Sequence, residues 1–148
     1  MELNSEDVKE SISKTLLNIF PNANVYKEAS SSPKYPNFFI RQINVSDREE
    51  RRNYHILTYN MDIRYRTTSD PSTDLKLEQN LDDVGLKLLA NFNTIDFDDS
   101  KIKCLDKSIE KQDGVLHFFT NFEIMVKLCN IDEEIIKQNN LALEVKYG

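Results

Sequence analysis

The chain has 148 residues, 39% of them hydrophobic and 30% charged, a balance that fits one globular domain with a single hydrophobic core. Its 25 acidic and 19 basic residues give a net charge of -6, so it lacks the basic excess of a dedicated nucleic-acid-binding protein. It has no apolar run of about eighteen residues that would span a membrane, and none of its three glycines has the spacing of a phosphate-binding loop.

The N-terminal region predicts an amphipathic helix from about Ser5 to Phe20. Asn4 or Ser5 can cap its first turn, and Pro21 ends it because proline cannot donate the next backbone hydrogen bond. Residues 1–7 lack the basic start and apolar centre of a secretory signal, so we expect the chain to stay in the cytoplasm where it is made. The apolar residues of the helix recur at steps of three and four: Val8, Ile12, Leu16, Ile19 and Phe20.

The next region predicts extended structure on both sides of a loop. Val25 and Tyr26 begin a short extended piece, and the serines and prolines of Ser30–Pro36 favour a loop. Phe38–Val45 predicts a strand that is nearly continuous in apolar residues, so both of its faces could be covered. Asp47–Arg52 then predicts a charged turn.

A third strand and a second helix follow. Leu57–Tyr65 alternates between apolar and polar residues, as a half-buried strand does. Asp70 and Pro71 can cap and start a helix that ends near Asn93. Its apolar residues have helical spacing: Leu77, Leu81, Val84, Leu88 and Phe92.

The strongest local signal is Asp113-Gly114 between two alternating runs, which predicts a two-residue hairpin because both positions tolerate positive φ. A direct register around this turn predicts four facing pairs: Gln112 with Val115, Ile109 with Phe118, Leu105 with Phe122, and Cys104 with Glu123. The same register places Cys129 opposite Asp98, about 20 Å along the strand from Cys104, which excludes a disulfide.

Together these elements predict an α+β fold, with a mainly antiparallel sheet of four to five strands and two amphipathic helices packed on it. We expect one domain over residues 1–148. The segment 130–148 is ambiguous, because Ile131, Ile135 and Ile136 suit one or two helical turns. The alternating apolar residues near the end of the chain suit a strand instead: Leu141, Leu143, Val145 and Tyr147.

Two groups of residues are candidates for contacts between subunits. The charged turn could form reciprocal ion pairs between identical neighbours, although a solvated hairpin tip is the default interpretation; its candidate residues are Arg48, Glu49, Glu50, Arg51 and Arg52. The register also predicts an apolar patch on the polar side of the hairpin, formed by Phe119 and a cross-strand pair of Ile102 with Met125. Scattered apolar residues on a sheet surface are common, so this patch has an ordinary structural explanation as well.

No residue pattern supports catalysis. His55 and His117 lie in strand patterns without metal-ligand spacing to Cys, Asp or Glu, and neither cysteine has the flanking motif of a nucleophile. We therefore expect no catalytic residue, no cofactor and no metal site.

Several stretches resemble the tail terminator family of phages and of tail-derived particles from Gram-positive bacteria. Leu16–Pro21 followed by Val25-Tyr26 resembles the end of that family's first helix and its first strand, and Asn37–Ile40 and Tyr54–Tyr65 resemble the next two strands. The most specific match is Asp113–Phe119, which is similar to the family's hairpin before its last long strand. The resemblance covers about residues 5–128, and Ser30–Pro36 departs from the glycine-containing segment expected there.

The resemblance implies a structural virion protein that assembles as a closed ring, a homo-hexamer, on the last ring of tail tube protein. Such a ring ends tube growth and offers a surface to the head connector, and in a contractile tail it also contacts the sheath. The implied place is a virion tail or a phage-tail-like particle assembled in the bacterial cytoplasm. A neck or head-completion adaptor, and a small cytoplasmic protein-binding module, are alternatives left open by the residues.

Overall fold

The computed structural model describes residues 5–68, 75–97 and 99–127, so the predictions for 130–148 and for Cys129 opposite Asp98 lie outside the described residues. Two helices and seven strands follow one another along this part of the chain: α1 (Ser5–Ile19), β1 (Asn24–Tyr26), β2 (Asn37–Arg51), β3 (Tyr54–Arg66), α2 (Leu75–Asn91), β4 (Thr94–Phe97), β5 (Ser100–Lys103), β6 (Lys107–Gln112) and β7 (Val115–Lys127). None of these helices is long and apolar enough to cross a membrane.

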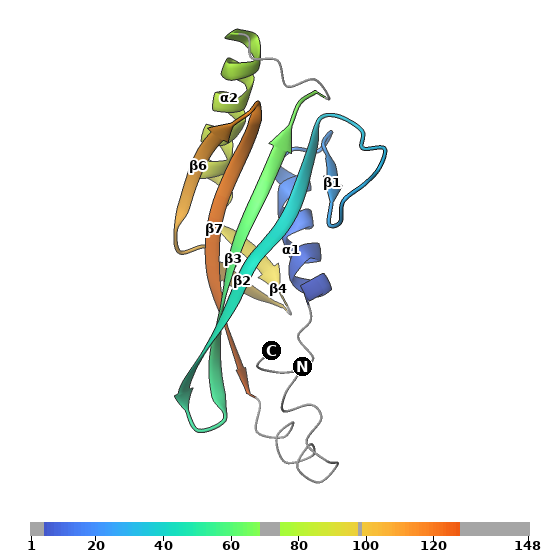
Figure 1. The fold of residues 1–148 in the computed structure, drawn as a ribbon. Helices are drawn as coiled ribbons and strands as arrows, with labels where there is room; N and C mark the ends of the chain where they lie inside the picture. The colour runs from blue at the N-terminus through green and yellow to red at the C-terminus, as the bar shows by residue number, and fades with distance from the viewer. Residues whose placement is uncertain (1–4, 69–74, 98, 128–148) are drawn as a thin grey trace.

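Five of the strands form one sheet in the order β1-β2-β3-β7-β6 (Figure 1). The short β1 pairs in parallel with β2, and the other three pairings are antiparallel. β4 and β5 form a separate antiparallel hairpin. The predicted α+β fold is confirmed, with a mainly antiparallel sheet and two helices.

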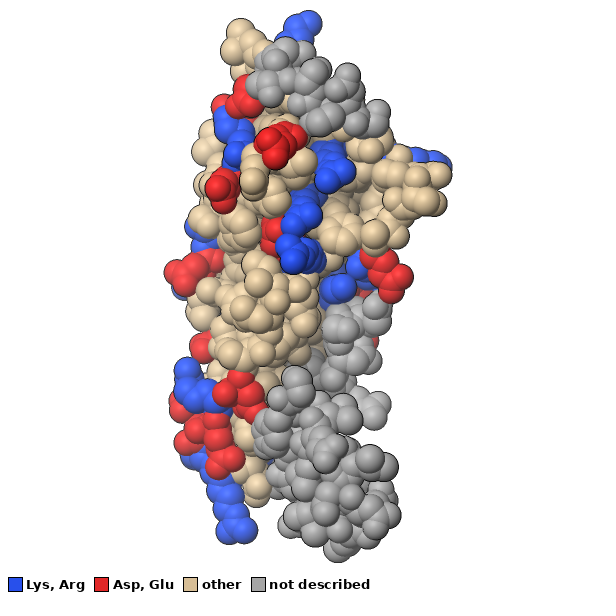
Figure 2. Space-filling view, viewed as in Figure 1, with Lys and Arg blue, Asp and Glu red and all other residues tan. Residues whose placement is uncertain are grey.

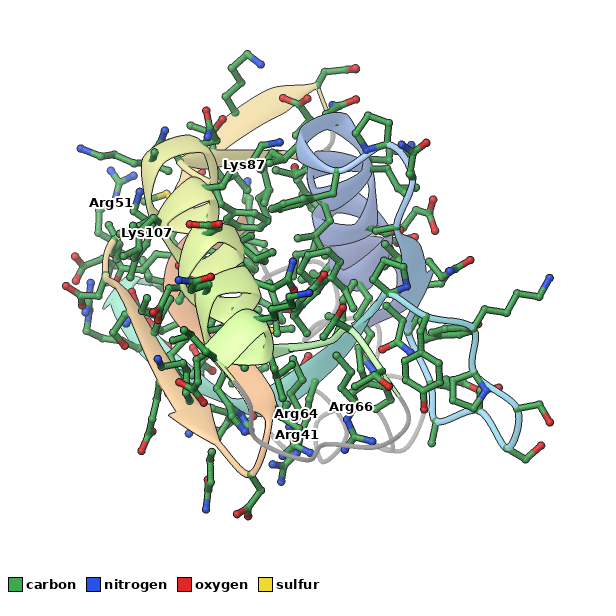
Figure 3. The ribbon with its side chains drawn as sticks, turned by 90° about the horizontal axis from the view of Figure 1, so that it is seen from above. Arg41, Arg51, Arg64, Arg66, Lys87 and Lys107 are labelled. Carbon is green, nitrogen blue, oxygen red and sulfur yellow. The ribbon has the colours of Figure 1, made fainter. Side chains whose placement is uncertain are left out.

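Both helices lie on the same side of the five-stranded sheet, and they are seen side by side in the view from above (Figure 3). α1 contacts β1, β2 and the β4–β5 hairpin, whereas α2 contacts β6 and β7. Lys111 of β6 ties α2 to the sheet through ion pairs of 2.7 Å with both Glu78 and Asp82, which raise the pKa of its ammonium group. Gly85 allows the close approach of α2, because a Cβ there would lie 2.7 Å from Ile109 Cδ1.

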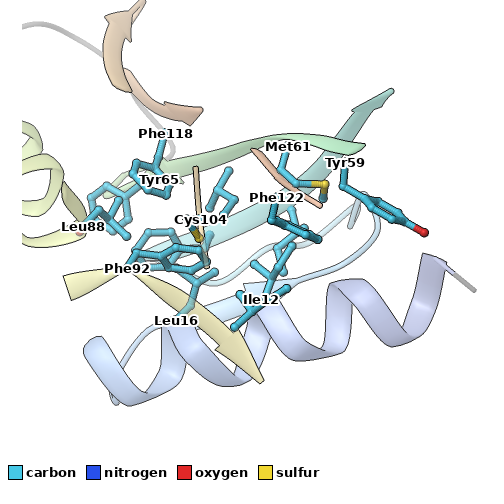
Figure 4. Packing of buried hydrophobic residues seen from close by; sticks show 14 of the residues in the cluster. Ile12, Leu16, Tyr59, Met61, Tyr65, Leu88, Phe92, Cys104, Phe118 and Phe122 are labelled. Carbon is cyan, nitrogen blue, oxygen red and sulfur yellow. The ribbon is translucent and has the colours of Figure 1, made fainter. Parts of the chain in front are cut away.

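The core lies between the helices and the sheet, and aromatic rings from both layers meet there (Figure 4). Phe92, which follows α2, makes an edge contact with Phe118 of β7, and Tyr59 stacks on Phe122. Most of the apolar residues predicted on one side of each helix are buried, and Ile19 and Phe20 are partly buried. Alternate residues of β3 and β7 are buried as well. The largest fully buried side chains are Phe38, Phe92, Phe118, Phe122, Ile12, Leu16, Ile40, Met61, Ile63, Leu81, Leu88 and Ile95.

The predicted Asp113-Gly114 hairpin is confirmed. Both residues have positive φ, 52° and 75°, and the register pairs Gln112 with Val115 and Ile109 with Phe118 as expected. The pairing ends at Lys107, however, so the expected facing pairs Leu105–Phe122 and Cys104–Glu123 are wrong.

The chain leaves the hairpin register because the segment before β6 turns toward the helices. The Cys104 amide donates to the Asn93 carbonyl over 2.9 Å, which draws the cysteine into the core, and β5 pairs with β4 instead of β7. Leu105, expected opposite the buried Phe122, is 52% exposed. Ile102 faces Ile95 across the β4–β5 hairpin, so its predicted pairing with Met125 is wrong as well.

The predicted charged turn is shorter than expected. β2 continues through Asp47 to Arg51, and only Arg52 and Asn53 form the turn, with Asn53 at φ 71°. The apolar pattern of the sequence does not predict a strand in this polar stretch. Pairing with β3 nevertheless continues here, because it provides hydrogen-bond partners for the backbone N–H and C=O groups. The far end of this hairpin, Ser46–Thr58, extends beyond the helices and is called the hairpin arm below (Figure 1).

Candidate functional site

The face of the five-stranded sheet opposite α1 and α2 carries no helix from the described residues, and we call it the open face (Figure 1). Along β7 the even-numbered side chains of Leu116–Val126 are buried, so the odd-numbered ones lie on the open face. The register of β3 with β7 continues this face, since Asp62 lies opposite Phe119 and Arg64 opposite His117. The open face is therefore where this fold offers a broad surface to a partner.

Three arginines gather at one end of the open face, and we call Arg41, Arg64 and Arg66 the arginine cluster. Arg64 and Arg66 are two residues apart on β3, and Arg41 lies on the neighbouring β2 opposite Asp62. Figure 3 shows the three side chains together on the side of the sheet away from the helices. Arg41 and Arg66 are exposed, and neither makes an ion pair with any residue that the structure describes.

A buried carboxylate holds the centre of this cluster in place. Asp62 is only 3% exposed, although it lies on the open face. Its Oδ2 accepts a hydrogen bond from Arg64 Nε at 3.0 Å, and its Oδ1 lies 3.1 Å from Nδ1 of His117. His117 in turn stacks on Phe119, with ring centroids 5.8 Å apart. A buried charge is costly unless it is paired, so Asp62 fixes both partners and leaves the cluster as a whole basic.

Open pockets flank the pair of Arg64 and Arg66. One lies between the sheet and the loop after β1, where Tyr26, Pro33 and Phe39 give it an apolar lining and the two arginines form its rim. The loop is held there in part by a hydrogen bond of 2.9 Å from the Lys34 amide to the Tyr26 hydroxyl. The pocket thus combines an apolar floor with two guanidinium groups.

A second pocket, also lined by Arg64 and Arg66, lies on the β7 side of these residues. It is lined by polar residues of the β6–β7 turn, Gln112 and Asp113, and by His117. The arginine pair therefore separates an apolar pocket from a polar one, and an extended segment crossing it could contact both.

The middle of the open face is uncharged, as the broad tan area in Figure 2 shows. Asn60 donates to Asn44 Oδ1 over 2.7 Å, and a shallow depression beside them is lined by Ile43, Phe119 and Asn121. Ile43 is 47% exposed at a register shift of β2. Phe119, predicted as a contact residue, therefore lies on this face with an exposed aliphatic neighbour.

The hairpin arm carries the charged residues that are candidates for a contact with a neighbouring copy. Arg48 lies 3.5 Å from Glu50 and 3.8 Å from Glu123 of β7. Glu49 points to the opposite face of the sheet, where its carboxylate is 3.5 Å from Nε2 of His55. These residues thus have partners within the chain and are divided between two faces.

The two remaining charged candidates lie at the tip of the arm. The Arg51 guanidinium lies 4.8 Å from the centre of the Tyr54 ring, a cation–π contact, and Arg52 is in the turn. Met125 is 55% exposed and pairs with Ile56 of the arm, which in turn pairs with Arg48.

The predicted apolar patch is not assembled as expected. Phe119 and Met125 share the open face, six residues apart on β7, but Ile102 is partly buried against the core on the helix side. The arginine cluster and Asp62 were not predicted. The alternate positions of Asp62, Arg64 and Arg66 along one strand can be seen in the sequence. Their contact with His117 depends on the pairing of β3 with β7, which are distant in the sequence.

The described residues offer little reactive chemistry. No group of three or more His, Cys, Asp or Glu side chains among them is placed to hold a metal ion. Cys104 is 4% exposed, and its burial raises the pKa of the thiol, with the Thr120 hydroxyl and Lys107 opposing this only in part. The open face offers instead a cluster of arginines flanked by two pockets.

A family model described as phage tail terminator protein matches residues 7–134, which include every strand described above, the whole of α2 and all but the first two residues of α1. No curated protein matches the chain.

Proposed function

Because this chain belongs to the phage tail terminator proteins and is thus a structural component of a phage tail, we propose that its copies close into a ring on the end of the tail tube. The ring ends polymerisation of the tube and presents a surface to the head connector. In a contractile tail the same ring also contacts the end of the sheath. The match across residues 7–134 is the observation that carries this proposal.

The shape of the fold is compatible with such a ring. A closed ring of identical subunits needs two different complementary surfaces on each copy, so that every subunit binds the next one head to tail. The open face offers one broad surface, and the opposite side of the hairpin arm, which carries Glu49, offers a second. We propose a homo-hexamer assembled in the bacterial cytoplasm.

This function requires no catalysis and no cofactor. Halting a polymer requires only that the ring match the tube on one side and fail to present a new tube-binding surface on the other. The burial of the Cys104 thiol agrees with such a structural role.

The test is tail length in particles made without this gene. Electron micrographs of the deletion should show overlong or unfinished tubes, and supplying the gene in trans should restore a single tube length. Tubes of normal length in the deletion would refute the proposal. Co-sedimentation of the purified chain with tail tubes separates it from a neck or head-completion adaptor, because an adaptor would bind a different end and would not pellet with tubes alone.

A further inference from the structure

The arginine cluster presents positive charge that the described part of the chain does not neutralise. Arg41 and Arg66 are exposed without an ion-pair partner among the described residues, and Asp62 is buried beneath Arg64. Arginine binds carboxylates through a planar fork of donors, so a run of acidic side chains is the chemically matched ligand. The ligand should also carry apolar side chains, because Tyr26 and Phe39 line the adjoining pocket with apolar surface beside the arginines.

One segment of the sequence has both properties. Asp132, Glu133 and Glu134 form the only run of three consecutive acidic residues in the chain, and Ile135 and Ile136 follow directly. An acidic run next to two aliphatic side chains matches a basic rim next to an apolar pocket. The segment belongs to residues 128–148, which begin where β7 ends at the hairpin arm.

The same chain's acidic run cannot reach Arg66 or the pocket beside it. Lys127 at the end of β7 pairs with Tyr54, and Arg66 lies twelve residues further along β3, about 40 Å away at the rise of a strand. The seven residues from Lys127 to Glu134 span at most about 25 Å when fully extended. The pocket lies level with Arg64 and Arg66, on the β2 side of β3. The acidic run can therefore meet Arg66 only when the two belong to different copies.

We propose that Asp132–Glu134 of one copy binds the arginine cluster of the next copy, with Ile135 and Ile136 in the adjoining pocket. The contact is head to tail, because donor segment and acceptor cluster lie at opposite ends of β3 and β7. It rests on the proposed ring and names the surfaces that close it. Copies therefore associate through exchanged C-terminal segments.

Charge reversal on the full-length chain tests the contact. One variant, Arg41→Glu/Arg66→Glu, makes the cluster acidic, and a second, Asp132→Lys/Glu133→Lys/Glu134→Lys, makes the segment basic. Light scattering at matched concentrations should show self-association weakened at least about tenfold in each variant, because like charges then face each other. Arg64 is left unchanged because it pairs with the buried Asp62.

Mixing the two variants distinguishes exchange between copies from any effect within one chain. The acidic cluster of the first variant can bind the basic segment of the second. The second variant keeps the native basic cluster, which can bind the native acidic segment of the first. The mixture should therefore assemble with the two variants alternating. A chain carrying both sets of changes should also assemble. Lys76→Glu/Lys103→Glu, which reverses two exposed charges outside the cluster, should associate like the wild type.

The inference is overturned if either charge-reversed variant assembles as strongly as the wild type. It is also overturned if the mixture of variants fails to assemble, or if the wild-type chain stays monomeric up to its solubility limit. Tail length reports separately on the proposed function. Variants that keep their self-association but no longer bind tubes would assign the arginine cluster to another partner, and this too would overturn the inference while leaving tube termination intact.

Discussion

Replacing Asp62 with asparagine should weaken the fold by about 2 kcal/mol, because it removes a buried charge that organises the open face. The substitution keeps the shape of the side chain but loses the charge-assisted hydrogen bonds to Arg64 Nε at 3.0 Å and to Nδ1 of His117 at 3.1 Å. Hydrogen bonds to a charged group contribute about 1.5–3 kcal/mol, and we count mainly the His117 contact because the Arg64 side chain is 30% exposed.

Urea unfolding of Asp62→Asn measures this loss. With a slope of about 2 kcal/mol per molar urea, the midpoint should fall by about 1 M. Asp106→Asn is the matched control, since Asp106 is an exposed carboxylate near the same face with a long hydrogen bond of 3.4 Å from Asn121. Its midpoint should hardly change. An unchanged midpoint for Asp62→Asn, or an equal fall for the control, would refute the assignment of a structural role to the buried carboxylate.

Three further predictions concern the core and the turn. Phe92→Ala should cost about 3–5 kcal/mol in urea unfolding because the ring is fully buried, whereas Leu86→Ala on the 61% exposed side of α2 should stay within about 0.5 kcal/mol. In a Cys129→Ser chain, the raised pKa and burial of Cys104 should slow its reaction with a thiol reagent at least about tenfold relative to the urea-unfolded chain; equal rates would contradict the burial. Gly114→Ala should cost about 1–2 kcal/mol because its φ is 75°, and a thermal unfolding midpoint equal to the wild type would count against that strain.

Local signals accounted for most of the elements. The Asp113-Gly114 turn fixes its own register because its geometry is determined by two adjacent residues, and the helical spacing of the apolar residues identified both α1 and α2. The family resemblance, noted on the hairpin and the first strands, is confirmed by the match over residues 7–134.

Features that depend on distant contacts were not predictable in the same way. The turn predicts pairing as far as Cys104 only if the strand stays straight, but a hydrogen bond to Asn93 and the pairing of β5 with β4 redirect the chain. The neighbour of β3 is β7, more than fifty residues later, so nothing near Asp62 in the sequence announces His117. The arginine cluster is visible only once these strands are placed.

The two outermost strands of the sheet limit how copies of this protein can join. β1 has only three residues, and β6 carries Lys107, Glu110 and Lys111 among its six. Edge strands that are short or charged discourage the edge-to-edge pairing of sheets from different copies, which leads to amyloid-like aggregation. A protein that must gather in many copies at one spot can therefore remain dissolved until a specific side-chain contact selects its neighbour.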